Sequence, residues 1–282
     1  MQNMLIFGMG YTAAALAARL RAQGWRVTGT GRNGDLDFAD AEAVEAALAQ
    51  ASHVLSSVPP DRAGGDPVLD AYGAALRRWP GRWIGYLSST GVYGDVGGAW
   101  VDEAAPIGGG RRTARVEADR AWQALGPRVR VFRLPGIYGP GRSALERVAE
   151  GRAHRIALPE QVFSRVHVAD IVSGVVAALS GPPGVYNLAD DAPSSQNAVI
   201  EEAARLLGRV PPPLQTLEEA QLSPMALAFY AENRRVANGK AKRLLGWRPA
   251  YPDYREGLRA LNATTSPAAT STDPAAASSD HS

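Results

Sequence analysis

The sequence predicts an α/β fold built on a parallel β-sheet with crossover helices. In its first half, short β-branched or apolar runs alternate with Ala- and Leu-rich stretches at helical spacing. A glycine-rich turn separates the first expected strand from the first expected helix. The composition, 45% hydrophobic and 21% charged, is that of an ordinary globular protein. The 282 residues allow one large α/β domain, or such a domain with a small partner.

The first strands and helices can be placed in order along the chain. A strand is expected at Met4–Phe7, where apolar residues precede a glycine. A helix is expected over Tyr11–Gln23, because Gly24 is suited to end it. The second strand is expected at Arg26–Thr30, and a short third strand at Asp35–Phe38.

The rest of the first half repeats this alternation. A helix is expected over Ala41–Gln50, since Val44, Ala47 and Leu48 share one of its faces. The later strands are expected at His53–Val58, Trp83–Ser88 and Arg130–Leu134, and the later helices at Val68–Trp79 and Arg112–Leu125.

The second half is less regular. It predicts an apolar helix, a short strand and a further helix, at Val168–Leu179, Val185–Leu188 and Gln196–Leu207. After the proline-rich link 211–213, short helical pieces are expected up to about Leu261. Residues 262–282 are rich in Ala, Ser, Thr and Pro and contain no large apolar residue. Such a segment cannot bury enough surface to offset its ordering entropy, so it is predicted to be a disordered tail.

The composition argues against several classes of protein. Only Lys240 and Lys242 are lysines among 30 basic residues, so the other 28 (30 − 2) are arginines. Cysteine is absent, which excludes thiolate nucleophiles, disulfides and thiolate metal sites, and four histidines argue against a multi-histidine metal site. A net charge of +2 with acids interspersed argues against nucleic-acid binding. No apolar run reaches the ~18 residues of a membrane span, and no signal peptide is evident, so we expect a cytoplasmic protein without a membrane partner.

The turn at Gly8–Ala13 reads G-x-G-x-x-A, a form of the dinucleotide-binding fingerprint. Gly8 makes the tight turn, and Gly10 lets the backbone approach a pyrophosphate. The small Ala13 lets the helix pack close to the strand, and the helix N-terminus offers free N–H groups to phosphates. Its strand–turn–helix setting predicts a dinucleotide site; the alternative is a structural turn that binds no ligand.

About twenty residues later, an NAD-selective site would offer an acid to the ribose hydroxyls, but this sequence reads Thr-Gly-Thr-Gly-Arg over 28–32. The planar fork of Arg32 suits a 2′-phosphate, which favours NADP over NAD, although Arg32 could also be a surface arginine. Asp35 and Leu36 are expected to border the adenine; Asp35 could equally be a turn residue.

Four later segments resemble the extended short-chain dehydrogenase/reductase superfamily, in its nucleotide-sugar epimerase/dehydratase group. They are LSSTGVYG (Leu87–Gly94), RLPGIYGPGR (Arg133–Arg142), RVHVADI (Arg165–Ile171) and VYNLADD (Val185–Asp191), and with the glycine turn they run in the family's order over about residues 4–261. The resemblance implies a Rossmann-type doubly wound parallel sheet with a small C-terminal substrate-side lobe, and a nicotinamide cofactor. It implies a Rossmann domain over 1–140 and 165–190, and a small lobe over 141–164 and 191–261.

The resemblance also implies site residues. Ser89 matches the catalytic Ser/Thr that hydrogen-bonds the reacting oxygen, although a strand-end serine is by itself more often a turn residue. Pro135 and Ile137 lie in a segment that lines the nicotinamide, which is compatible with a rigid turn after a buried strand. His167 and Asp170 recur at the start of a helix in this family. We interpret Asp170 as capping or charging that helix start and His167 as a satisfied polar residue.

The superfamily's Tyr-x-x-x-Lys dyad is missing. Alignment on R-V-E-A-D places Arg115 at the Lys position and Arg111 at the Tyr position. Arg115 could still hold a ribose or a phosphate, but a guanidinium cannot replace a phenol in proton exchange. No tyrosine lies between Tyr93 and Tyr138, so Ser89, Tyr93, Tyr138 or a bound water must help to move the proton, and Tyr93 is our choice.

The sequence thus predicts two groups of site residues and leaves two functions open. The expected catalytic residues are Ser89, Tyr93 and Arg115. The expected cofactor-binding residues are Gly8, Gly10, Tyr11, Thr12, Ala13, Thr30, Arg32, Asp35, Leu36, Ser57, Ser88, Pro135 and Ile137. We expect an NAD(P)-dependent oxidoreductase or epimerase-like enzyme; the alternative is a non-catalytic NADP-binding sensor or scaffold.

The expected partner is a small-molecule substrate. An anionic or nucleotide-sugar-like compound would suit the arginines of the substrate side, which are Arg142, Arg147, Arg152, Arg155 and Arg165. At least half of these arginines could equally be solvated surface residues.

Overall fold

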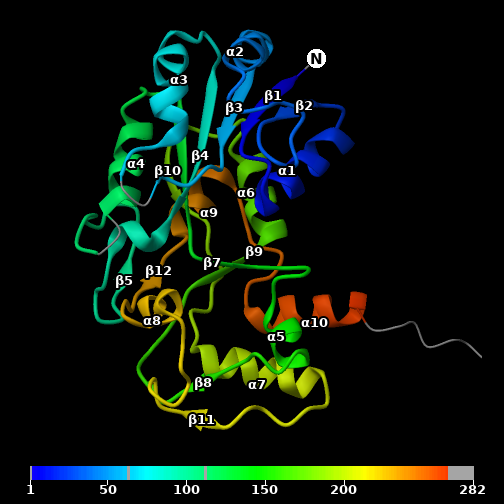
Figure 1. Cartoon of the computed structure of the whole chain (residues 1–282), viewed down its shortest axis with the longest axis vertical. Coiled ribbons are helices and arrows are strands. Elements are labelled where there is room, and N and C mark those ends of the chain that lie inside the picture. Colours follow the sequence, from blue (N-terminus) through cyan, green and yellow to red (C-terminus); the bar gives the residue numbers. More distant parts are fainter. Residues whose placement is uncertain (1, 62–63, 111–112, 266–282) are drawn as a thin grey trace, which may run out of the picture.

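A computed structural model describes residues 2–61, 64–110 and 113–265 of the chain (Figure 1). Its central element is a six-stranded sheet in which every pair of neighbouring strands is parallel. The strands are β1 (Asn3–Phe7), β2 (Arg26–Gly29), β3 (His53–Ser56), β4 (Trp83–Ser89), β6 (Val129–Leu134) and β10 (Gly184–Asn187). Their order is β10-β6-β4-β3-β1-β2, so the chain changes direction across the sheet between β1 and β3. In open α/β sheets, ligands bind beside the carboxyl ends of the strands at such a switch point.

Helices cover both faces of the sheet. α1 (Tyr11–Ala22) and α6 (Val168–Ala177) pack on one face, and α2 (Ala41–Gln50), α3 (Pro67–Arg78) and α4 (Thr113–Gln123) pack on the other. Alternate residues of β1 serve the two faces, because successive side chains of a strand point to opposite sides. Met4 and Ile6 belong to the core under α1 and α6, whereas Leu5 and Phe7 belong to the core under α2 to α4.

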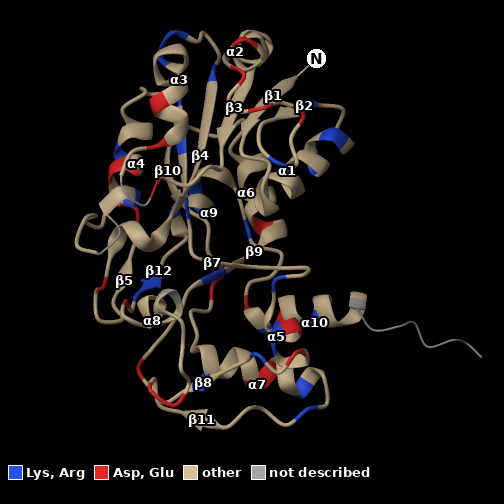
Figure 2. Ribbon diagram, viewed as in Figure 1, with Lys and Arg blue, Asp and Glu red and all other residues tan. Residues whose placement is uncertain are grey.

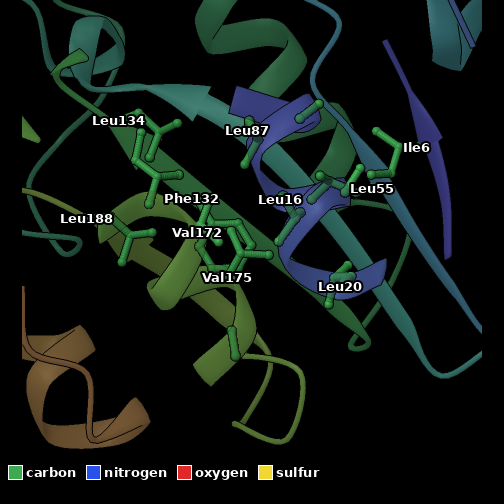
Figure 3. Packing of buried hydrophobic residues seen from close by; sticks show 14 of the residues in the cluster. Ile6, Leu16, Leu20, Leu55, Leu87, Phe132, Leu134, Val172, Val175 and Leu188 are labelled. Carbon is green, nitrogen blue, oxygen red and sulfur yellow. The ribbon is translucent and has the colours of Figure 1, made fainter. Parts of the chain in front are cut away.

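The core under α1 and α6 sets the position of the glycine turn. Figure 3 shows Leu16 and Leu20 of α1 facing Val172 and Val175 of α6 and the sheet residue Phe132. All five side chains are buried. This packing therefore fixes the N-terminus of α1 next to the carboxyl end of β1.

A second lobe lies below the sheet in Figure 1. Its core joins α5 (Ala144–Ala149), α7 (Gln196–Leu206) and α10 (Tyr254–Thr265), which bury apolar residues such as Leu145, Ile200 and Leu258 against one another. The lobe also contains β8 (Arg155–Ile156), paired with β11 (Leu214–Gln215), and α8 (Pro224–Tyr230).

Short two-stranded pairs and helices connect the sheet with this lobe. β7 (Gly136–Tyr138) pairs with β9 (Arg165–His167), and β5 (Trp100–Val101) pairs with β12 (Arg235–Val236). The remaining elements are η1 (Thr90–Tyr93), a single 3₁₀ turn after β4, and α9 (Gly239–Leu245).

The predicted α/β fold with a parallel sheet is confirmed, and the sheet strands lie close to their expected positions. The strand expected at Asp35–Phe38 is wrong: only an isolated bridge joins Thr30 to Leu36. The backbone N–H groups of Asp35 and Leu36 both donate to the Gly29 carbonyl, at 2.7 and 3.1 Å, so this segment forms a turn.

The chain's last part also differs from expectation. The sequence places the end of the last helix near Leu261, whereas α10 continues to Thr265. The rest of the predicted disordered tail, residues 266–282, lies outside the described residues, as does Arg112 at the expected start of α4. Across residues 2–61, 64–110 and 113–265, no helix is both long and apolar enough to span a bilayer.

Candidate functional site

A cleft of about 440 Å³ lies at the carboxyl edge of the sheet, beside the switch point. It is lined by several of the residues that the sequence assigns to the site: Gly10, Tyr11, Thr12, Ser57, Ser88, Ser89, Arg115, Pro135 and Ile137. These come from α1, from the ends of β3, β4 and β6, from α4 and from β7, which are far apart in the sequence. The cleft lining does not include Gly8, Ala13, Thr30, Arg32, Asp35, Leu36 or Tyr93.

The glycine turn is shaped by two different glycine requirements. Gly8 has a φ of +84°, and a Cβ there would meet Val58 Cγ2 at 2.8 Å, so only glycine fits. A Cβ at Gly10 would have no heavy atom within 4 Å, so this backbone is open from the cleft side. Thr30 accepts a hydrogen bond from the Gly8 N–H at 3.1 Å, and Ser57 donates to the Gly8 carbonyl at 2.5 Å. These two hydrogen bonds, with Thr30 and Ser57, fix the backbone of the turn.

The N-terminus of α1 is an uncapped helix end that borders the cleft. Its N-cap residue, Gly10, provides no side-chain hydrogen bond, and the first turn contains no acidic residue. Tyr11 and Thr12, the first helical residues, line the cleft, while the fully buried Ala13 packs beneath them. Free N–H groups and the positive end of the helix dipole favour an anion at such a place. The open backbone at Gly10 leaves room for a pyrophosphate, so these residues fit a dinucleotide.

The end of β2 presents no carboxylate to a ribose. Asp35 accepts a hydrogen bond from the Gly29 N–H at 3.1 Å, and Arg21 Nη2 lies 3.5 Å from the same carboxylate. Of the two interpretations of Asp35, the hydrogen bond supports a turn residue. Arg32 is exposed on the same turn, and Leu36 packs against the core under α2 to α4.

Ser88 and Ser89 end β4 and both line the cleft, but their hydroxyl groups are used differently. Ser89 Oγ accepts a hydrogen bond from the Gly91 N–H at 3.1 Å and so caps the 3₁₀ turn η1. Ser88 Oγ donates to Asp119 Oδ2 at 2.6 Å, into the protein. Ser89 is therefore the better placed of the two to meet a ligand in the cleft.

A buried polar network supports this strand end. Asp119 on α4 accepts from Ser88, from Gln123 Nε2 at 2.6 Å, and from two nitrogens of Arg133 on β6. Arg133 Nη1 also donates to the Tyr93 hydroxyl at 3.0 Å. Because each polar group here has a partner, the network can stay buried directly beneath the cleft.

Tyr93 does not reach the cleft, which corrects our choice of this residue for the proton transfer. Its hydroxyl donates to Asn187 Oδ1 at 2.8 Å, and the side chain is only 2% exposed. Burial raises the pKa of the Tyr93 hydroxyl above its usual value. The turn η1 directs this ring inward, and the family motif alone does not show that direction.

The remaining tyrosine and arginine candidates also differ in whether they reach the cleft. Tyr138, the sequence's alternative proton carrier, is buried with its hydroxyl against α10: a Cβ at Gly257 would lie 2.1 Å from it. Arg115 lines the cleft, as its place in the family motif implies. Arg111 lies outside the described residues.

His167 and Asp170 both make structural hydrogen bonds, but the expectation of a satisfied His167 holds only for Nδ1, because its buried Nε2 has no partner among the described residues. His167 Nδ1 accepts from the Ala169 N–H at 3.2 Å and caps α6. Asp170 lies in the first turn of α6, but its carboxylate accepts from the N–H groups of Ala250 at 2.6 Å and Tyr251 at 3.1 Å. The predicted acidic residue at the helix start is present, while the side chain that caps the helix is His167.

The structure brings two expected residues together and adds two, Phe229 and Arg234, that sequence reasoning does not assign to the site. Arg142 lies in the cleft wall with its guanidinium 5.8 Å from the centre of the Tyr11 ring, and the Tyr11 hydroxyl donates to the Pro140 carbonyl at 3.0 Å. Among the described residues lining the cleft, Tyr11 is the only tyrosine. Phe229 of α8 and the following Arg234 close the cleft from the second lobe. No periodicity or spacing marks this segment, because it joins the site only through folding.

Comparisons with known proteins place the chain in a family. No protein-family model matches it. A structure of a functionally unknown conserved protein from Silicibacter pomeroyi DSS is 44% identical, with a TM-score of 0.84, and the match covers 94% of this chain and 99% of that one. Protein YeeZ of Escherichia coli K12 is 29% identical over 245 residues, which are 75% of this chain and 86% of YeeZ.

A more distant structure shows the fold. The human epimerase family protein SDR39U1, whose crystal structure contains NADPH, is 17% identical with a TM-score of 0.74, and the match covers 93% of this chain and 99% of that one. The chain therefore belongs to the same family as the Silicibacter pomeroyi protein, and it shares its fold with the human epimerase family protein.

Proposed function

We propose that the chain binds a nicotinamide dinucleotide in the cleft and is an oxidoreductase or epimerase-like enzyme acting on a small molecule. One observation carries this proposal: the uncapped N-terminus of α1 and the open backbone of Gly10 border a cleft that Ser89 also lines. The pyrophosphate would lie on that helix end, and Pro135 and Ile137 would line the nicotinamide. Such a cofactor, when bound, supplies or accepts a hydride.

The same proposal prefers NADP to NAD. The Asp35 carboxylate accepts from the Gly29 N–H and lies 3.5 Å from Arg21, so Arg21 would partly offset its negative charge beside a 2′-phosphate. Arg32 is exposed at the same edge and offers a guanidinium fork to a 2′-phosphate. The NADPH named with the human structure agrees with this preference.

The chain's own residues would then hold and orient a substrate. The Ser89 hydroxyl would hydrogen-bond the reacting oxygen, and Arg115 would bind a ribose hydroxyl or a phosphate. Because Tyr93 is buried and the Tyr-x-x-x-Lys dyad is missing, the reacting oxygen would gain or lose its proton through the Ser89 hydroxyl, which would in turn exchange a proton with water. The lobe formed by 141–164 and 191–261 would supply the substrate-side wall, with the Rossmann domain over 1–140 and 165–190.

The second candidate is a non-catalytic NADP-binding sensor or scaffold. The missing dyad and the burial of Tyr93 favour this candidate, because together they leave no tyrosine hydroxyl at the usual catalytic position beside the cofactor. Both candidates require the same cleft, and they differ only in turnover.

The cofactor part is tested by titrating NADPH and following nicotinamide fluorescence for the wild type, Gly10→Val and Ala18→Val. Gly10 has a φ of −85°, which valine adopts, and a Cβ there meets no protein atom, so this variant should fold. We expect Gly10→Val to weaken NADPH binding at least about tenfold, because the new methyl groups occupy the phosphate's place. Ala18→Val, on the exposed side of the same helix, should bind like the wild type.

The enzyme and the sensor are separated by hydride exchange. Protein, NADPH labelled at the nicotinamide and a panel of carbonyl compounds are incubated, and transfer of the label to product is measured. Transfer to any member of the panel supports the enzyme. Tight binding of NADPH without transfer favours the sensor, and no binding of either NADPH or NADH would overturn both candidates.

A further inference from the structure

A second cavity, of about 330 Å³, adjoins the cleft on the side of α5. The two share Gly136, Ile137, Arg142 and Phe163 in their walls, so a molecule in one lies next to a molecule in the other. In Figure 2, blue segments of β9 and of the chain around α5 border this part of the molecule, between the sheet and the second lobe.

The charges lining this cavity are unbalanced. Four of its residues are arginines (Arg142, Arg147, Arg152 and Arg165), and one is an acid, Glu146. The Glu146 carboxylate is already used: it accepts from the Ser143 N–H at 2.8 Å and from the Gly141 N–H at 3.1 Å.

Only one of the four arginines has an ion pair. Arg152 pairs with Glu150. In the part of the chain that the structure describes, no carboxylate lies within ion-pair distance of Arg142, Arg147 or Arg165. Among the described residues, three of the four arginines lining the cavity therefore have no carboxylate within ion-pair distance.

Arg165 is held in place before any ligand arrives. Its side chain is only 7% exposed, and its guanidinium donates to the Phe163 carbonyl at 2.9 Å, to Ser194 Oγ at 2.8 Å and to Gln196 Oε1 at 3.0 Å. Burial lowers the pKa of Arg165 to about 10, so it is still a cation at pH 7. Because uncharged groups fix it, its charge is positioned but not neutralised.

Asp190 is the acid that interacts electrostatically with Arg165, and it compensates this charge little. Burial raises the pKa of Asp190 to about 8, so the carboxyl group is largely protonated at pH 7. Arg147 is an exposed residue whose pKa is lowered by desolvation and by the charges of Arg152 and Arg142, while Tyr230 and Glu146 partly offset this lowering. Like charges held together around a cavity are unfavourable, and a bound anion would relieve their repulsion.

We propose that the second cavity binds a compact oxyanion of charge two or more, a phosphate group or a pair of carboxylates, at one end of the substrate. Arg165 supplies charge only, because its Nη1 and Nη2 already donate to Phe163, Ser194, Ser195 and Gln196. The guanidinium forks of Arg142 and Arg147 can match both kinds of oxyanion in two-point geometry. A volume near 330 Å³ is at the lower end of small-molecule sites, which favours a compact substrate. Phe163 and Phe229 in the wall stack on each other at 4.5 Å. That the oxyanion belongs to a substrate rests on the function proposed above; its binding site does not.

The test is calorimetric titration of the whole chain, with and without saturating NADPH, at one ionic strength. The probes are inorganic phosphate, malonate, acetate and UDP. We expect phosphate or malonate to bind at least about tenfold more tightly than acetate, whose single charge matches the site less well. If phosphate binds more tightly than malonate, the substrate carries a phosphate group at this end. If malonate binds more tightly, the substrate carries a pair of carboxylates there. With saturating NADPH in the adjoining cleft, UDP should bind no more tightly than phosphate, because its base then has no space beyond the cavity.

Arg147→Gln is the decisive variant, since Arg147 lines only the second cavity. It should weaken the preferred anion about tenfold or more, and Arg147→Lys, which keeps the charge but loses the fork, should weaken it less. Arg78→Gln makes the same charge change on the exposed side of α3 and should bind like the wild type. NADPH affinity should stay within about twofold in every variant, because none alters the cleft.

Equal binding of acetate and phosphate, or equal behaviour of Arg147→Gln and Arg78→Gln, would overturn the inference. With saturating NADPH, UDP binding at least about tenfold more tightly than phosphate would overturn its compact-substrate part. Failure of the wild type to bind NADPH would instead overturn the proposed function, and the anion titration would still decide the second cavity.

Discussion

Arg133 on β6 and Asp119 on α4 form a two-point ion pair directly beneath the cleft. Arg133 Nε lies 3.1 Å from Asp119 Oδ2, and Arg133 Nη2 lies 2.9 Å from Asp119 Oδ1. The side chains are 4% and 0% exposed. Since Asp119 also accepts from Ser88, the pair links the helix, the strand and the end of β4 that carries Ser89.

Removal of one partner should therefore be costly. Asp119→Ala leaves the Arg133 guanidinium buried and unpaired, and we expect a loss of about 3–5 kcal/mol in the free energy of unfolding. The measurement is urea denaturation followed by circular dichroism. Glu117→Ala, on the exposed side of the same helix, should change the free energy by less than about 0.5 kcal/mol. Equal stability of the two variants would show that the pair contributes nothing.

The NADP preference makes Arg32 a selectivity residue. Arg32→Ala should weaken NADPH binding about tenfold while leaving NADH binding within about twofold, because only NADPH carries a 2′-phosphate for the fork. The measurement is a fluorescence titration of both cofactors. Arg19→Ala removes an exposed arginine farther along α1 and should alter neither affinity. Unchanged NADPH affinity in Arg32→Ala would remove this residue from the site.

A substitution at Ser89 should change the reaction rate, whereas a substitution at Tyr93 should change the stability of the fold. Ser89→Ala should lower the hydride-transfer rate roughly 100-fold with little change in NADPH affinity, since the lost hydroxyl would contact the reacting oxygen. Tyr93→Phe should cost about 1–3 kcal/mol of stability, because Asn187 and Arg133 lose a buried partner, while its rate stays within about twofold. Tyr251→Phe removes the hydroxyl of a tyrosine outside the cleft lining, and it is the control for the effect of a Tyr-to-Phe change on stability. A large fall in rate in stable Tyr93→Phe would return Tyr93 to the chemistry.

Asp190 should make stability fall as the pH rises. Burial raises its pKa to about 8 in the folded protein, far above the ordinary aspartate value of 3.8. Between these two values the folded state binds a proton that the unfolded state has released, so unfolding becomes easier with increasing pH. Asp190→Asn cannot release that proton. Urea denaturation at pH 5 and pH 8 should show a larger loss for the wild type than for this variant, and equal losses would contradict the raised pKa.

Much of the dinucleotide half could be predicted because its signals are local. The strands reveal themselves by apolar runs, and the turn at Gly8 needs a φ that only glycine adopts readily. The error at Asp35–Phe38 has a local cause too, since the run contains β-compatible residues but the Gly29 carbonyl takes both N–H groups in a turn. The second lobe was less accessible, because its short elements are stabilised by contacts between distant segments.

The sequence by itself determined the sheet, the glycine turn, the absence of lysine before residue 240 and the absence of tyrosine between Tyr93 and Tyr138. These depend on residue type and on short-range spacing. Only the tertiary structure decided that Tyr93 points into a buried network, that Tyr11 and Arg142 meet across the cleft, and which arginines lack acidic partners. A motif specifies where the backbone goes, whereas the direction of a side chain and the balance of its charge depend on segments that folding brings together from elsewhere in the chain.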